Sequence, residues 1–480
     1  MRALAENIVC GAARRPTLLG CAILPVLLGL TWSEPALGQG SVSSVSLTPF
    51  VTGLIPVVGP RGGVGGVSID AAGVVARSDV ESLGRLREAR LRALTRISDD
   101  VAATSPLRKI SLRGLAATID QLRQERRPVS DELQNLAGLQ RVQFVFVYPE
   151  RHDIVLAGFA EGWKVDSQGN VVGQRTGQPA LQLDDLIVAL RTAKNANTQS
   201  GITCSMDPTK EGAQRLQRLL GTRGLQWNEA NISRLEEALG PQQITLTGVP
   251  PGSHFAHVLV AADFMLKRLG MNFEPAPIAG MPSYMELLQA PGAPAPRNAM
   301  PRFWLAPSYE PVLKDAAGLA WQLRGSGVQA EAEDGRLGAQ GNPIAARGKE
   351  NSPAHKWAET MTAKYDALAA ALPVFAELRN CMDLAVVAAL LLKEDLPGKA
   401  GCDLALLLDD ERIKVAEYHV PQTIDSRASL IRKGQQWIVG VSGGVEIDSW
   451  SVVNRTEVRP DLTDKRKQAE SVVDNRWWWD

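Results

Sequence analysis

The stretch 141–173 most constrains what this chain can fold into. Its first run, 142–148, is rich in valine and aromatic residues, and its second run, 154–159, is apolar throughout. The turn-forming segment 166–170 then separates two shorter runs. β-Branched and aromatic residues between turn signals are typical of strands. We therefore expect three or four adjacent antiparallel strands here, with helical segments before and after them.

Strands and helices are predicted along the rest of the chain, without regular βαβ spacing. The clearest unit is 243–269, where a strand leads through the turn Pro250-Pro-Gly-Ser253 into a helix that stops before Gly270. Further helices are predicted at 111–124, 183–191, 355–372 and 377–393, and further strands at 202–206, 404–408 and 436–447. The predicted fold class is α+β (mixed α/β), with antiparallel or mixed sheets packed with helices.

Changes in composition divide the chain into segments, and the Pro-rich stretch 291–301 is the best candidate for a boundary between two domains. The predicted segments are a signal peptide (1–39), a Gly/Pro/Ser-rich leader (40–77), an N-terminal α/β domain (78–290), the linker (291–301), a C-terminal α+β domain (302–460) and a charged tail (461–480). The tail carries Trp477-Trp478-Trp479. These tryptophans could dock onto the body of the protein, bind a partner or stack on carbohydrate.

The first 39 residues have the features of a secretory signal. Arginines at positions 2, 14 and 15 precede an apolar run at 18–30, and small residues follow at 36–38. The apolar run is shorter than the roughly 20 residues that a helix needs to span a bilayer. We therefore expect a periplasmic or secreted protein without a transmembrane helix in the mature chain, although retention of the signal as an anchor stays open.

The charges of the chain are balanced, with 52 Lys and Arg against 52 Asp and Glu. A nucleic-acid binder needs a net basic field or a strongly basic face, so the sequence predicts no nucleic-acid partner. Beyond residue 39 the cysteines are Cys204, Cys381 and Cys402. In an oxidising compartment Cys381 and Cys402, the nearest pair in sequence, could form a disulfide. Three buried free thiols are the alternative.

His254 and His257 are the strongest candidates for a metal site. They are spaced i, i+3 on a predicted helix, so they share a face and could ligate one metal ion with a third ligand from elsewhere. No HExxH pattern accompanies them. The alternative places His254 in solvent at the helix start, with His257 packing or bonding locally.

Signatures of catalysis and cofactor binding are sparse in the chain. It contains no phosphate-binding Gly-Lys-Ser/Thr and no C-x-x-C-H. The string Gly440-Val-Ser-Gly-Gly444 has the G-x-S-x-G spacing of a serine nucleophile, but it lies within a predicted strand, where a structural bend is expected instead. The sequence therefore predicts no cofactor and names no catalytic residue.

Several strings resemble an uncharacterised family of exported bacterial proteins, of the planctomycete type, that is defined only as a domain of unknown function. They are 203–209 (TCSMDPT), 246–256 (LTGVPPGSHFA), 261–263 (AAD) and 436–444 (QWIVGVSGG). The likeness would cover most of 140–450. It implies export and a shared fold, and it implies no activity or site.

Together these features predict an exported soluble binding or scaffold protein of the cell envelope, with an unknown protein or glycan as its partner. A hydrolase acting on a peptide or glycan, with a site assembled only in the fold, is the alternative. Two carboxyl groups with raised pKa values in one cleft would favour the hydrolase. A structural envelope component that self-associates is a third possibility.

Overall fold

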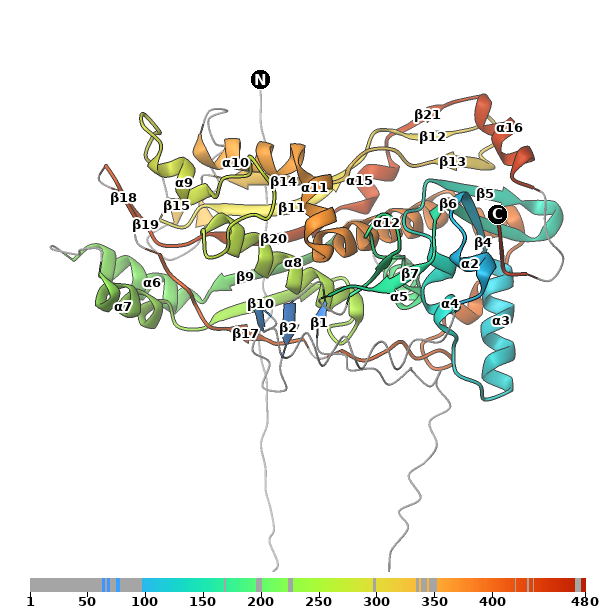
Figure 1. Ribbon diagram of the computed structural model, residues 1–480, viewed down its shortest axis with the longest axis horizontal. Coiled ribbons are helices and arrows are strands. Elements are labelled where there is room, and N and C mark those ends of the chain that lie inside the picture. Colours follow the sequence, from blue (N-terminus) through green and yellow to red (C-terminus); the bar gives the residue numbers. More distant parts are fainter. Residues whose placement is uncertain are drawn as a thin grey trace, which may run out of the picture. The chain divides into compact units, whose positions relative to one another are not determined.

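The computed structural model (Figure 1) describes residues 97–480 except for short gaps at 168–169, 196–200, 223–227, 297–298, 334–335, 338–342, 345–351, 419, 430, 435 and 471–475. It also describes three short antiparallel strands, β1 (Gly63–Val64), β2 (Val67–Ile69) and β3 (Val75–Arg77). The predicted signal peptide at 1–39 lies outside the described residues. All described residues belong to one compact unit.

A seven-stranded mixed sheet has the order β21-β12-β13-β5-β6-β4-β22. Its strands are β4 (Ser105–Ser111), β5 (Phe144–Tyr148), β6 (Asp153–Ala160), β12 (Val312–Lys314), β13 (Ala320–Gln322), β21 (Thr456–Val458) and β22 (Trp478–Trp479). β5 and β6 form the antiparallel hairpin predicted within 141–173. The other two strands of that block, β7 (Trp163–Val165) and β8 (Val171–Gly173), pair with each other in a separate small sheet. The prediction of adjacent antiparallel strands is confirmed, although they divide between two sheets.

A six-stranded sheet has the order β14-β11-β20-β9-β10-β17, and only β11 and β20 run parallel. Its strands are β9 (Ile202–Pro208), β10 (Gln242–Thr247), β11 (Arg302–Ser308), β14 (Gly327–Glu333), β17 (Thr423–Ile424) and β20 (Ser442–Ile447). Alternate residues such as Cys204, Met206 and Phe303 are buried, while their neighbours are half-exposed. Because side chains alternate across a strand, one face of this sheet enters the core and the other stays open.

Helices cover the buried sides of both sheets. The central helix α12 (Pro373–Lys393) is buried along almost its whole length and packs on α5 (Leu183–Asn195) and α8 (His254–Gly270), as Figure 1 shows. A helix that is apolar nearly all round is expected inside a core. Shorter helices are α2 (Asp99–Ala102), α3 (Leu112–Gln124), α4 (Asp131–Gln134), α6 (Lys210–Leu220), α7 (Glu229–Leu239), α9 (Tyr284–Gln289), α10 (Pro353–Ala363), α11 (Tyr365–Ala371), α13 (Leu396–Ala400), α14 (Ala405–Leu408), α15 (Ser449–Val453) and α16 (Asp461–Gln468).

Several predicted boundaries coincide with capped helix ends. The hydroxyls of Ser111, Thr209 and Ser253 accept main-chain N–H hydrogen bonds at the starts of α3, α6 and α8. The strand predicted at 404–408 is wrong, because these residues form α14. Four apolar residues in a row show no periodicity, so burial alone does not separate a strand from a short helix.

The fold is α+β, as predicted. Both large sheets take strands from either side of 291–301, so the sheets do not divide at that Pro-rich segment. Two further pairs of short strands are β15 (Arg336–Leu337) with β16 (Pro343–Ile344) and β18 (Ile431–Lys433) with β19 (Gln436–Ile438). Within the described part of the chain, no helix is both long enough and apolar enough to cross a membrane.

Candidate ligand-binding site

The tryptophan triplet docks onto the edge of the seven-stranded sheet. Trp478 and Trp479 form β22, which pairs antiparallel with β4 opposite Ile110 and Lys109. The two indoles enter different apolar clusters, because successive side chains of a strand point to opposite faces. Docking, one of the three roles considered for these tryptophans, is therefore what the structure shows.

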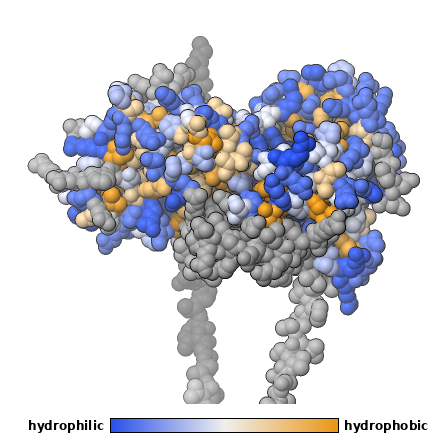
Figure 2. Space-filling view, viewed as in Figure 1, coloured by the Kyte–Doolittle hydropathy of each residue, from blue (hydrophilic) through white to orange (hydrophobic). Residues whose placement is uncertain are grey.

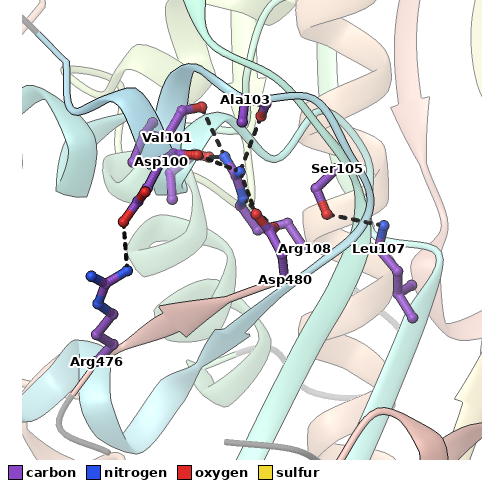
Figure 3. Close-up of polar contacts among 9 residues, drawn as sticks. Asp100, Val101, Ala103, Ser105, Leu107, Arg108, Arg476 and Asp480 are labelled. Atoms are coloured by element: carbon purple, nitrogen blue, oxygen red, sulfur yellow. Dashed lines mark hydrogen bonds and ion pairs between the residues drawn. The ribbon is translucent and has the colours of Figure 1, made fainter. Parts of the chain in front are cut away.

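A buried arginine anchors this strand (Figure 3). The guanidinium of Arg108, which is 0% exposed, donates from Nε and Nη2 to the two carboxylate oxygens of Asp480 at 2.8 and 2.9 Å. It also lies 4.6 Å from the centroid of the Trp478 ring. Its remaining hydrogens go to the main-chain carbonyls of Asp100, Val101, Ala103 and Ala137. Two parallel hydrogen bonds between a guanidinium and a carboxylate fix the relative orientation of the two groups, so the position of β22 is closely determined.

A cavity of about 540 Å³ lies beside β22, at the start of α3, the end of β5 and the start of β6. Its charged and aromatic lining consists of Arg113, Asp153, Tyr148, Arg151, Arg476, Trp477 and Trp479. Hydroxyl and amide groups come from Ser111, Thr118 and Gln121. We call this space the tryptophan cavity.

The tryptophan cavity has three arginines against one carboxyl group. Arg113 is exposed and makes no ion pair with the described residues. Arg151 lies 3.7 Å from Glu470, and Arg476 pairs with Asp100 at 2.9 Å between groups that are each at least half exposed. Exposed ion pairs of this kind contribute only ~0.2–1 kcal/mol, so an anion in the cavity can compete for these arginines.

Asp153 is the carboxyl group in this lining, and it caps α3. Its Oδ2 accepts the Ser111 hydroxyl at 2.6 Å, and its Oδ1 accepts the Arg113 main-chain N–H at 3.1 Å. Burial raises the pKa of Asp153, although these hydrogen bonds oppose that rise. The side chain is therefore committed to the helix end, and its charge only partly offsets the arginines.

His254 and His257 lie at the start of α8, on the side of the helix that faces Tyr418. His254 Nδ1 is 2.8 Å from Asp185 Oδ2 on α5, and both imidazole rings contact the Tyr418 ring edge-on. Burial acts to lower the pKa of His254, but the ion pair with Asp185 outweighs it and raises the pKa to about 9. His254 is not in solvent, because its side chain is only 13% exposed. Among the residues that the structure describes, no group of three metal-ligating side chains could hold a metal ion.

The three cysteines beyond residue 39 are buried as free thiols. Cys381 and Cys402 are therefore not joined in the structure. Burial raises the pKa of each thiol, to about 11 for Cys402. Thiols in this state are poor nucleophiles, which fits structural positions.

A buried ion pair on α8 was missed at the sequence level. Asp263 is 0% exposed, and Lys267 Nζ lies 2.6 and 2.7 Å from its two oxygens. Lys267 also donates to the Gly443 carbonyl of β20 at 3.1 Å. Burial raises the pKa of Asp263 to about 7, against the opposing effect of Lys267. An Asp and a Lys spaced i, i+4 on an otherwise apolar helix would have indicated such a pair.

Fold and cavity together define an α+β protein with a basic, aromatic-lined candidate site at one sheet edge. Residues 204–284, from β9 to the start of α9, match the family described as Protein of unknown function (DUF1598), so the chain contains a domain of this family. No curated protein and no solved structure matches the chain. The resemblance to a family of unknown function is confirmed for this part of the chain. The string 436–444 and the tryptophan cavity lie outside the matched residues.

Proposed function

We propose that this protein is an exported binding protein of the cell envelope whose tryptophan cavity takes an acidic saccharide. The observation that carries the proposal is the concentration of arginines at positions 113, 151 and 476 around one cavity in a chain with no net charge. Arginine presents planar, forked donors that match carboxylate and phosphate oxygens. An anionic ligand fits this charge.

The other lining groups support a saccharide as the carrier of that negative charge. Trp477 is half-buried, lines the cavity and offers a ring on which a sugar can stack. Thr118 and Gln121 also line the cavity; Thr118 Oγ1 donates to the Gly114 carbonyl and Gln121 Nε2 donates to Glu125, which leaves their oxygens to accept hydrogen bonds from sugar hydroxyls. A few polar groups around an aromatic surface are what a specific small-ligand site requires.

Surface hydropathy also supports a polar ligand. Figure 2 shows hydrophilic side chains over much of the described surface in view, with hydrophobic residues in small separate groups. The large hydrophobic side chains that are exposed in the described residues are Phe273 in the loop after α8, Leu392 on α12 and Val458 on β21. A protein partner that needs one continuous apolar patch is less well supported.

The hydrolase alternative needs paired carboxyl groups. Raised pKa values occur at Asp153 and Asp263. Asp153 lines the tryptophan cavity and caps α3, whereas Asp263 is fully buried in its ion pair with Lys267. These two carboxyl groups do not share a cleft, so binding is better supported than hydrolysis.

Calorimetric titration with two matched sugars tests the proposal. The protein, recovered after expression of the full chain, is titrated with a galacturonic acid trisaccharide and with the uncharged galactose trisaccharide of the same linkage. We expect the acidic sugar to bind at least tenfold more tightly. Arg113→Gln should weaken its binding, while Arg218→Gln, which removes an exposed arginine on α6, should not. Equal affinity for the two sugars, or no binding at millimolar concentration, contradicts the proposal, and cleavage of either sugar would favour the hydrolase.

Export is tested separately by fractionating a bacterial host that expresses the full chain. We expect the protein outside the cytoplasm, with a mass that corresponds to loss of about the first 39 residues. A full-length protein confined to the cytoplasm contradicts export.

A further inference from the structure

The six-stranded sheet has a polar face on the side away from its buried residues. Thr203 and Ser205 on β9 are half-exposed, and Thr245 on β10 and Glu446 on β20 are exposed. Helices α8 and α10 pack on the opposite face, where Phe303 contacts Trp357 of α10. The polar face therefore presents hydroxyl and carboxylate groups outward across the three neighbouring strands β20, β9 and β10.

A trough of about 340 Å³ runs across the middle of this face. The strand register places Trp304 of β11 beside Gly444 of β20, and Gly444 beside Ser205 of β9. Since Gly444 has no side chain, nothing on β20 fills the space between the indole and the serine hydroxyl. The strand register therefore forms the trough, with the Trp304 side chain as one wall and β9 as the other.

The glycines of β20 are required by the backbone. Gly443 has φ +115°, and a methyl group there would collide with the Phe303 carbonyl oxygen. Its own carbonyl is turned toward α8 and accepts a hydrogen bond from Lys267, the partner of buried Asp263. The residues matched to the family of unknown function thus contribute two parts of this arrangement. One is β9, which forms a wall of the trough, and the other is the Asp263–Lys267 ion pair, whose lysine bonds to β20.

The charge of the trough is negative. Glu333 and Glu446 line it, and among the described residues of its lining Arg302 is the one cation. The register sets Glu331 directly opposite Trp304 and Glu333 directly opposite Arg302. Since Arg302 and Glu333 offset each other, Glu446 leaves the trough with a negative charge, and negative charge beside a tryptophan favours an organic cation, which the ring quadrupole also attracts.

We propose that this trough binds a saccharide that carries a free amino group. The ammonium group pairs with Glu446, a sugar ring stacks on Trp304, and the hydroxyls of Thr203 and Ser205 bond to the sugar. This site is separate from the tryptophan cavity and has the opposite charge, so it does not depend on the function proposed above.

A matched pair of sugars tests the proposal in the protein expressed from the full chain. The probes are a β-1,4-linked glucosamine tetramer and its fully N-acetylated, uncharged counterpart, titrated calorimetrically below pH 7. We expect the amino form to bind at least tenfold more tightly than the acetylated form. Glu446→Gln should weaken binding of the amino form at least fivefold, and Trp304→Phe should weaken it to a smaller degree.

Glu457→Gln is the matched control, because it removes an exposed carboxylate from β21 of the other sheet. It should leave glucosamine binding unchanged, and all variants should keep their melting temperatures. Equal binding of the two tetramers overturns the charge argument, and tighter binding of a lysine tetrapeptide than of the amino sugar makes the site one for basic peptides. No binding at millimolar concentration also overturns the proposal. Binding of the acidic trisaccharide should not change in Glu446→Gln, so the two proposed sites can fail independently.

Discussion

Arg108 and Asp480 are 372 residues apart in the chain and form a two-point ion pair, with Nε–Oδ1 and Nη2–Oδ2 distances of 2.8 and 2.9 Å. The arginine is fully buried, whereas the aspartate is 43% exposed. A buried charge is costly without its partner, so this pair ties the last strand of the seven-stranded sheet to β4. The position of β22, and with it one side of the tryptophan cavity, depends on that contact.

We expect Asp480→Asn to destabilise the protein by about 1–3 kcal/mol, because the Arg108 charge loses its counterion while its carbonyl partners remain. Urea unfolding measures the loss. Asp461→Asn is the control, since Asp461 and Arg459 form a pair in which both side chains are more than half exposed. An Asp480→Asn variant as stable as the control would show that Arg108 does not need this carboxylate.

The buried Asp263–Lys267 pair predicts a non-additive double mutant. Lys267→Met leaves a buried carboxyl group alone and should cost about 3–5 kcal/mol at high pH, where Asp263 must ionise. Because burial already raises the pKa of Asp263 to about 7, the loss should be smaller below that pH. The double variant with Asp263→Leu should recover much of the stability. Additive losses in the double variant would contradict this interpretation.

The His254–Asp185 pair predicts that stability falls in mildly alkaline solution. The pKa of His254 is about 9 in the folded protein and ~6.5 when unfolded, so its contribution is fully present below the lower value. As pH rises through 9 the imidazolium loses its proton, and up to about 3 kcal/mol is lost. Unfolding free energies measured between pH 6 and pH 10 should show this slope in the wild type.

His254→Gln should flatten that slope, while His355→Gln should preserve it, because His355 lies on α10 with an exposed partner, Glu359. The same slope in all three proteins would mean that another group is responsible for the pH dependence.

The two outer tryptophans of the triplet should differ in their effect on stability. Trp479 is buried in the cluster with Phe144 and Tyr148, so Trp479→Ala should cost about 3–5 kcal/mol. Trp477 is half-buried in the lining of the cavity, and Trp477→Ala should cost far less while it weakens binding of the acidic trisaccharide. Thermal melts of both variants separate the two roles. Equal losses of stability would contradict the different burial.

Thiol titration without reductant tests the state of the cysteines. A chain that lacks residues 1–39 should show three reactive thiols after denaturation and almost none while folded, because Cys204, Cys381 and Cys402 are all buried. A single thiol after denaturation would instead indicate a disulfide, with Cys381 and Cys402 the pair to map first.

Local patterns predicted individual elements well. The capping serines Ser111 and Ser253 mark the starts of α3 and α8, and the apolar run in 377–393 predicted the buried helix α12. The prediction of a strand at 404–408 was wrong because a short apolar run has no periodicity that distinguishes a helix from a strand.

The two candidate sites, in contrast, could not be predicted from local sequence patterns. Arg113, Arg151 and Arg476 are distant in sequence and meet only because β22 returns to the edge of β4. The trough likewise depends on the register of β11, β20 and β9, which long-range pairing decides.

The sequence by itself determined the α+β class, the starts of helices α3 and α8 and the hairpin at 141–173, because each depends on neighbours within a few turns or strand residues. The tertiary structure decided which strands share a sheet, where Trp477, Trp478 and Trp479 lie, and which charges are buried together. Those properties depend on contacts between residues hundreds of positions apart, such as Arg108 and Asp480. No local pattern encodes such contacts, because they form only when the whole core excludes water.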